Sequence, residues 1–269
     1  MFSELRKKSI QSYIVRPGRI TPSQKRALAN EIFDYGLFLK NGLINLEKTF
    51  NNTHKTILEI GFGMGSSVAE MACNNPNENY IGIEVHAPGI GNLINLIHDL
   101  KLSNIRIYWA DAIDVIDECI PDESIDRFQV FFPDPWHKKK HNKRRLVTEN
   151  FLVRVSKKLR SGGIFHFVSD WKPYADSVIE ISENSDLFVN TALNGKFTDK
   201  PDYRPMTKFE KRGIQLGHSI WEIILQKIEE VDKNERGNKS TQSCCNFIWL
   251  WTLRWIGSLR DSLDTFTSR

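Results

Sequence analysis

The sequence predicts a Rossmann-like α/β fold, in which a mostly parallel sheet of seven strands carries helices on both faces. From His54 onward, short apolar runs alternate with amphipathic stretches, which is typical of β-α-β units and a parallel sheet. A glycine-rich turn follows the first of these runs, at the end of the sheet where such folds bind ligands. The length of 269 residues suits one α/β domain with short extensions, and 40% hydrophobic residues are enough for a buried core.

The predicted strands are short. Five of them lie at 56–60, 80–85, 105–109, 128–132 and 164–169, and a last pair lies at 187–190 and 219–226. Helical segments are expected between them, at 66–73, 88–100, 112–118 and 146–159. An earlier helix is predicted from Thr21 to about Tyr35, because proline at position 22 suits a first turn and apolar residues recur at helical spacing.

Three regions follow from this pattern. Residues 1–20 are expected to form a flexible basic arm, and residues 21–230 the α/β domain. The tail 231–269 is atypical and is expected to be partly disordered, because residues 232–243 are polar. Within it, residues 247–256 hold three tryptophans and are too short to span a bilayer, which leaves open an interfacial segment, a docking helix or a non-native extension.

Bulk composition excludes several classes of protein. The formal net charge of +4 is mildly basic. None of the four cysteines stands in a C-x-x-C pair, so the sequence predicts neither a metal site nor a disulfide framework. There is no signal-peptide core at the start and no apolar run of membrane-spanning length, so we expect no transmembrane segment and a cytoplasmic location. The oligomeric state stays open, a homo-oligomer included.

The glycine-rich turn has the spacing G-x-G-x-G, with Gly61, Gly63 and Gly65 directly after Glu59-Ile60. Glycines let the backbone turn sharply and approach a ligand closely. The third glycine of a dinucleotide motif is replaced by Ser66, and a carboxylate at Glu59 would repel a pyrophosphate. The turn therefore favours a cationic ligand such as S-adenosyl-L-methionine over a dinucleotide.

Two further carboxylates follow the next two strands. Glu84 ends the second strand, 23 residues after Gly61, where an acid accepts hydrogen bonds from ribose hydroxyls. Asp111 follows the third strand and could accept from an adenine amine. Each acid alone could simply cap the next helix. Together with the glycine turn, they predict a cofactor site and a class I methyltransferase fold.

The fourth strand leads into Phe131-Phe132-Pro133-Asp134-Pro135-Trp136-His137. Two prolines make this loop rigid and fix Asp134 at the crevice, beside an aromatic side chain able to stack on a base. A carboxylate accepts well from the N1–H and N2–H groups of guanine. A purely structural turn is the alternative.

A run of six cations in eight residues follows, at 138–145. Beside a catalytic crevice, such a cluster suits contacts with nucleic-acid phosphates. The alternative is an ordinary solvated run of charge.

These segments together resemble the bacterial tRNA (guanine-N7-)-methyltransferase family. The similarity extends over about residues 15–228 and includes EIGFGMG at 59–65, IGIEVH at 81–86, FFPDPWHKKKHNKRR at 131–145, SDW at 169–171 and TKFEKRG at 207–213. The long string at 131–145 is much more specific than the glycine turn. The resemblance implies transfer of a methyl group from S-adenosyl-L-methionine to N7 of guanine 46 in the variable loop of tRNA.

The resemblance also implies residue roles. Asp134 would be the catalytic acid position. The cofactor would be held by Glu59, Gly61, Gly63, Gly65, Glu84, Asp111 and Asp134. The substrate would be contacted by Lys138, Asp170, Thr207, Lys208, Phe209 and Glu210. The RNA backbone would be met by Lys140, His141, Asn142, Lys143, Arg144 and Arg145.

Other functions stay open at this stage. A methyltransferase acting on another RNA base or on a protein would share the cofactor motifs, and mapping of the methylated group would distinguish it. A non-catalytic RNA-binding protein is disfavoured by the intact set of acids. A nicotinamide dehydrogenase is disfavoured by Glu59 and by the missing third glycine of the dinucleotide motif.

Overall fold

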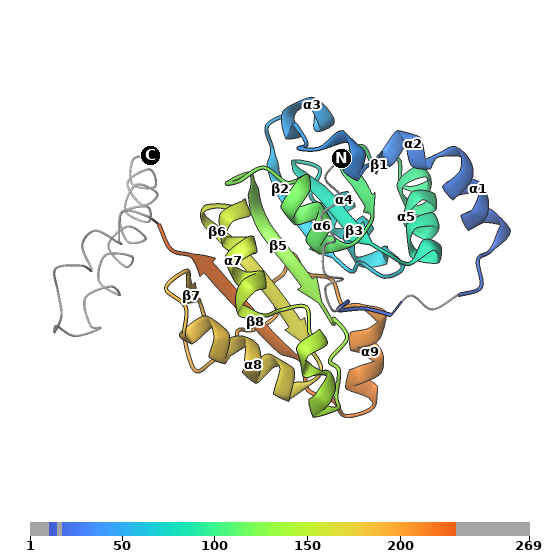
Figure 1. The fold of residues 1–269 in the computed structure, drawn as a ribbon. Coiled ribbons are helices and arrows are strands. Elements are labelled where there is room, and N and C mark those ends of the chain that lie inside the picture. Colours follow the sequence, from blue (N-terminus) through green and yellow to red (C-terminus); the bar gives the residue numbers. More distant parts are fainter. Residues whose placement is uncertain (1–10, 15–17, 230–269) are drawn as a thin grey trace, which may run out of the picture. The chain divides into compact units, whose positions relative to one another are not determined.

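The computed structural model of the chain describes residues 11–14 and 18–229. The chain divides into two compact units, Met1–Ile228 and Glu229–Arg269. The first unit contains every helix and strand named below (Figure 1). The predicted tail, including its tryptophan-rich segment, lies outside the described residues, as do residues 1–10 and 15–17 of the predicted arm.

One sheet organises the fold, and it confirms the Rossmann-like α/β prediction. Its strands, in spatial order, are β1 (Gly36–Leu37), β4 (Ile105–Trp109), β3 (Glu78–Glu84), β2 (Lys55–Ile60), β5 (Ile125–Phe131), β6 (Leu159–Ser169), β8 (Trp221–Lys227) and β7 (Phe188–Asn190). The first six are parallel, and β8 runs antiparallel to both β6 and β7.

The sheet has one strand more than the seven predicted. The additional strand, β1, consists of two residues that pair with Ile107 and Tyr108 of β4. So short a strand shows no periodicity in the sequence, which is why the hydrophobic pattern did not reveal it.

Helices cover both faces of the sheet. On one face lie α6 (Ala112–Glu118), α7 (Glu149–Lys158) and α8 (Lys172–Glu183), whose apolar side chains share a core with the strands. In Figure 1, α6 and α7 cross in front of the strands. A second core, on the other face, unites α4 (Ser66–Asn74) and α5 (Ala87–Asp99) with residues of β2, β3 and β4.

The predicted early helix is divided in two. Thr21 caps α1 (Pro22–Asn30) through a capping box with Gln24, as the threonine-proline start suggested. Glu31 ends α1, and a separate turn, α2 (Ile32–Tyr35), follows. Helices α3 (Leu46–Phe50), α8 and α9 (Lys208–Gln215) were not predicted, nor were the 3-10 turns η1 (Leu39–Asn41) and η2 (Lys139–Arg144).

Part of the second face carries buried polar side chains. Gln129 of β5 lies opposite His166 of β6, and Glu222 of β8 lies opposite Val168, two residues further along β6. All three polar side chains are buried. Tyr203 and Arg204, which precede α9, contact two of them: Tyr203 forms a hydrogen bond with His166, and Arg204 donates to Glu222. The loop before α9 therefore closes this part of the sheet.

Among the residues that the structure describes, no helix has the length and apolar content needed to cross a membrane. Within the same part of the chain, no group of three or more His, Cys, Asp or Glu side chains is placed to hold a metal ion.

Candidate active site

A cavity of about 510 Å³ opens at the carboxyl ends of β2, β3 and β5. It brings together segments that are far apart in the sequence. Its lining includes Gly61, Glu84, Ala110, Ala112, Phe131–Asp134 and Ser12–Ile14. A smaller cavity of about 360 Å³ at the β1 edge is lined mainly by apolar side chains such as Ile32 and Trp109, and it has no carboxylate. The larger cavity is therefore the candidate site.

The glycine turn leaves room for a ligand next to the backbone. Gly61, Gly63 and Gly65 have φ values of 74°, 59° and 77°, in the left-handed region that glycine tolerates best. A Cβ atom on Gly61 or Gly63 would meet nothing within 4 Å, so both face open space. Gly89 of α5 packs from behind: a Cβ there would lie 2.1 Å from the carbonyl oxygen of Gly63. Helix α5 and the turn are thus fitted to each other.

Glu84 fastens this turn. Its Oε2 accepts a hydrogen bond from the amide of Gly63 at 2.9 Å, and its Oε1 accepts from the amides of Val85 and His86 at 2.7 and 3.1 Å. The carboxylate also lines the cavity. It is therefore held rigidly where a ligand hydroxyl could approach it.

Glu59 lies beneath the turn and is 3% exposed. Its Oε2 has no hydrogen-bond partner among the described residues. Burial, and secondarily the charge of Glu84, raise the pKa of Glu59 to about 8. A buried acceptor without a partner suits a cationic ligand group, which would compensate the cost of ionising it.

Asp111 has two partners. It caps α6, with Oδ1 accepting from the amide of Ile113 at 2.8 Å, so the helix-capping alternative applies to it in part. It also forms a hydrogen bond with Tyr13, whose pKa is raised to about 12 by burial and then by Asp111. Tyr13 lines the cavity together with Ser12 and Ile14. The described part of the predicted arm therefore lies over the candidate site.

The loop with Asp134 is held in an unusual conformation. Phe132 and Trp136 have φ values of 51° and 50°, and positive φ in bulky residues costs about 1–3 kcal/mol each. Tertiary contacts hold the loop: the amide of Phe132 donates to Val168 at 2.8 Å, and Nε1 of Trp136 donates to the carbonyl of Ser12 at 3.0 Å. Asp134 is exposed and lines the cavity between these two points.

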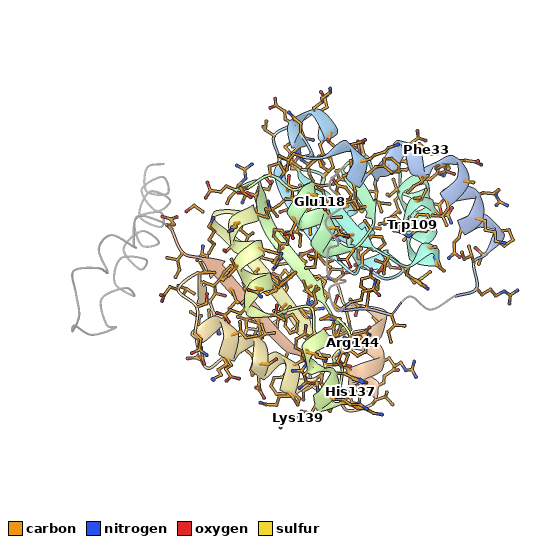
Figure 2. All side chains as sticks on the ribbon, in the orientation of Figure 1. Phe33, Trp109, Glu118, His137, Lys139 and Arg144 are labelled. Atoms are coloured by element: carbon orange, nitrogen blue, oxygen red, sulfur yellow. The ribbon has the colours of Figure 1, made fainter. Side chains whose placement is uncertain are left out.

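The basic run forms the turn η2 beside this loop. Lys138, Lys139, Lys140 and Lys143 are exposed. Figure 2 shows His137, Lys139 and Arg144 at the same end of the molecule. Arg144 stacks on Trp136 with its guanidinium carbon 4.6 Å from the ring centre. The exposed cations are therefore available to an anionic partner next to the cavity.

Two members of the basic run behave differently from the lysines. Burial and the neighbouring cations lower the pKa of His141, which meets the Trp136 ring edge-on, so this imidazole is protonated less readily than a free one. Asn142 is half-buried.

Arg145 differs more strongly from the predicted RNA contact. It is half-buried, donates from Nε to the carbonyl of Pro135 at 3.0 Å and from Nη1 to Ser177 at 3.2 Å, and stacks on Tyr174. These contacts hold the Asp134 loop to α8, and they leave the guanidinium little freedom to reach a phosphate. The contact of Arg145 with the RNA backbone therefore stays a prediction, beside the structural role that these contacts show.

The predicted substrate residues lie in two places. Asp170 follows β6, with its carboxylate 3.9 Å from Nδ1 of His218 and 44% of its side chain exposed. Thr207 caps α9 through a capping box with Glu210, and Lys208 and Phe209 begin this helix. Glu210 is 3% exposed, and both its oxygens accept from Arg204, at 2.6 and 2.9 Å. Both carboxylate oxygens of Glu210 are therefore engaged within the protein, and its contact with a substrate stays a prediction.

Comparison with known proteins identifies the family. A family model described as "Putative methyltransferase" matches residues 53–223. A tRNA (guanine-N(7)-)-methyltransferase of Saccharophagus degradans is 48% identical over 227 residues, which cover 84% of this chain and 99% of that protein. A protein of the same name from Francisella tularensis subsp. novicida is 46% identical and covers 82% of this chain and 96% of its own length.

The chain belongs to the tRNA (guanine-N7-)-methyltransferase family.

Among solved structures, the 16S rRNA methyltransferase KamB resembles the chain with a TM-score of 0.50 and 13% identity, over 68% of this chain and 92% of that one. This likeness concerns the fold alone. It agrees with the class I methyltransferase architecture predicted from the sequence.

In this member of the family, sequence reasoning missed several buried polar residues near the site. His166 interrupts an apolar strand, and Glu222 interrupts another. A lone polar residue inside an apolar run was the available signal, since a buried polar group requires a partner. Tyr203 and Arg204 gave no such signal, because they lie in a polar loop.

Proposed function

We propose that the chain transfers the methyl group of S-adenosyl-L-methionine to N7 of guanine 46 in the variable loop of tRNA. The observation that carries this proposal is the single cavity that joins the glycine turn, Glu84 and Asp134 beside the exposed lysines of η2. Membership of the family, at 48% identity to a relative of that name, supports the choice of substrate.

The residues that line the cavity, with Glu59 and Asp111 next to them in the chain, fit this cofactor. Glu59 supplies a buried acceptor without a partner for the cationic amino-acid end. Glu84 would accept from the ribose hydroxyls, and Asp111 from the adenine amine. The open space in front of Gly61 and Gly63 admits the ligand close to the backbone. When bound, S-adenosyl-L-methionine supplies an electrophilic methyl group on sulfur.

Transfer to N7 sets few chemical demands on the protein. Guanine N7 carries an in-plane lone pair, so no general base is needed before the transfer. The chain would act mainly by orientation, holding N7 in line with the methyl carbon and sulfur. The methylated ring gains positive charge, which the exposed carboxylates of Asp134 and Asp170 would stabilise.

The basic run would supply binding energy for exposing the base. Taking a guanine out of its stack costs a few kcal/mol. Contacts of Lys138, Lys140 and Lys143 with the phosphate backbone would offset this cost. Arg144, which stacks on the Trp136 ring, would supply a further cation for these phosphate contacts.

The decisive test combines labelled S-adenosyl-L-methionine with unmodified tRNA transcripts that carry guanine or adenine at position 46. We expect label only in the guanine transcript, recovered after digestion as 7-methylguanosine. Label at another position would contradict the specificity and retain the methyltransferase. No label, with cofactor binding shown by calorimetry, would contradict the proposed reaction.

A further inference from the structure

We propose that Arg204 is a positioning residue that holds α9, with its predicted substrate segment 207–210, against the sheet behind the cofactor cavity. Its side chain is buried and does not line the cavity. This inference rests on the proposed function in one respect: the expected loss of kcat is measured as methylation of tRNA.

Arg204 joins two elements by two bidentate ion pairs. Its Nη1 and Nη2 donate to the carboxylate of Glu210 in α9 at 2.6 and 2.9 Å. Its Nε and Nη2 donate to the carboxylate of Glu222 in β8 at 2.6 and 2.8 Å. The Arg204 side chain is fully buried, so water does not weaken these contacts.

The same network continues to the wall of the cavity. Oε1 of Glu222 also lies 2.7 Å from Nε2 of His166, whose Nδ1 is 2.8 Å from the hydroxyl of Tyr203. The His166 ring packs edge-on against Phe131, with ring centres 4.9 Å apart. Phe131 lines the cavity and lies three residues before Asp134. A continuous set of contacts therefore runs from α9 to the strand that presents Asp134.

The pKa shifts of the buried groups agree with ion pairs between Arg204 and its two carboxylate partners. The pKa of Glu222 is lowered although burial opposes its ionisation, because hydrogen bonds from His166 and Arg204 stabilise the carboxylate. Burial lowers the pKa of His166 itself, which disfavours a second buried cation beside Arg204. One buried guanidinium thus serves two carboxylates, and no lysine could form both bidentate pairs.

Stability alone is a weak reason for such an arrangement. Desolvating a buried ion pair often costs as much as its attraction returns, so apolar side chains could close this face equally well. Directional contacts do something that apolar packing does not: they specify one orientation of α9. The capping box between Thr207 and Glu210 then orients the first turn of that helix. In Figure 1, α9 lies at the same end of the sheet as the carboxyl ends of β5 and β6.

The test compares Arg204→Met, Arg204→Lys and Glu210→Gln with the wild type. Glu210→Gln keeps a side chain able to complete the capping box and removes one ion pair. Arg154→Met is the control at a more exposed arginine, since it removes the ion pair in which Nε of Arg154 in α7 donates to both carboxylate oxygens of Asp117 in α6. Each variant is assayed for thermal stability, S-adenosylhomocysteine affinity, kcat on tRNA, and amide hydrogen exchange of residues 208–215.

For Arg204→Met we expect kcat to fall on the order of 10–100-fold, as misplacement by about 1 Å does. S-adenosylhomocysteine affinity should stay within about twofold of the wild type, because the variant leaves the glycine turn and its acids in place. Exchange of the α9 amides should accelerate. For Arg204→Lys and Glu210→Gln, kcat and the exchange rate of the α9 amides should lie between those of Arg204→Met and the wild type. Arg154→Met should keep the wild-type kcat and exchange rate.

Two results would overturn the proposal. One is a folded Arg204 variant with wild-type kcat and wild-type exchange in α9. The other is a parallel loss of thermal stability, cofactor affinity and kcat, which would show a general role in folding. If the wild type itself does not methylate tRNA, the proposed function fails, whereas the exchange measurement still decides the role of Arg204. Should Arg204→Met not fold, Arg204→Lys and Glu210→Gln carry the test.

Discussion

Nε1 of Trp136 donates a hydrogen bond to the carbonyl oxygen of Ser12 at 3.0 Å, across 124 residues of sequence. This hydrogen bond joins the loop that carries Asp134 to the segment that lies over Asp111. The Asp134 side and the Asp111 side of the cavity therefore share one hydrogen bond.

Trp136→Phe removes this hydrogen bond and keeps an aromatic ring under Arg144. A neutral hydrogen bond contributes about 0.5–1.5 kcal/mol, so we expect S-adenosylhomocysteine affinity to fall roughly 2–10-fold in calorimetry. Ser12→Ala is the control, because it retains the backbone carbonyl that accepts the bond. Equal affinity of Trp136→Phe and the wild type for S-adenosylhomocysteine would show that this hydrogen bond does not stabilise the cofactor site.

Asp134→Ala should abolish methylation and leave bulk tRNA binding nearly intact, because the exposed lysines of η2 remain. Asp134→Asn separates charge from shape, since it keeps the size and removes the negative charge. We expect kcat to fall in both variants when measured with labelled cofactor. Turnover like that of the wild type in Asp134→Ala would contradict the assignment of this residue.

The basic run should divide into two kinds of cation. Replacing Lys143 and Arg144 by glutamine should weaken tRNA binding and reduce its salt slope, by about 0.7–0.9 for each phosphate that is no longer neutralised. Arg145→Gln should lower thermal stability and kcat with little change in salt slope, because this side chain binds Pro135 and Ser177. Binding is measured at several salt concentrations between about 50 and 200 mM, because the affinity of phosphate-binding proteins falls strongly over this range. A salt slope reduced equally by Arg145→Gln would place that residue at the phosphate interface after all.

Glu59 predicts a pH dependence of stability in the ligand-free protein. Its pKa is raised from 4.5 to about 8 in the folded state, so the folded protein holds the proton more tightly than the unfolded chain. The free energy of unfolding should therefore fall as pH rises from 4.5 to about 8, by up to a few kcal/mol, and then level off. Relative to Glu59→Gln, the wild type should lose stability over this window. If the free energies of unfolding of the wild type and Glu59→Gln differed by a constant amount over this window, the raised pKa of Glu59 would be excluded.

Ligand binding should act in the opposite direction at the same residue. A cationic group beside Glu59 stabilises its carboxylate, so affinity for S-adenosylhomocysteine should increase as pH rises through the same window. In Glu59→Gln this increase should be absent. Calorimetry at several pH values measures both variants under equal conditions.

Much of the fold could be predicted because its signals are local. Apolar runs separated by helical segments specified β2 to β6, and Thr21-Pro22 marked the start of α1 within one residue. The two-residue strand β1 was not predictable, since it forms only by pairing with β4. The break at Glu31 was likewise invisible, because the apolar spacing continues through it.

The sequence by itself determined the fold class, the glycine turn and the acids at the ends of neighbouring strands. These follow from residue type and spacing, and the parallel sheet brings them together. Only the tertiary structure decided which charges are already engaged. Arg145 binds Pro135, and Arg204 binds Glu210 and Glu222, so these groups serve the protein's own structure. The physical reason is that an ion pair depends on distance and burial in space, which a charged residue's position along the chain does not reveal.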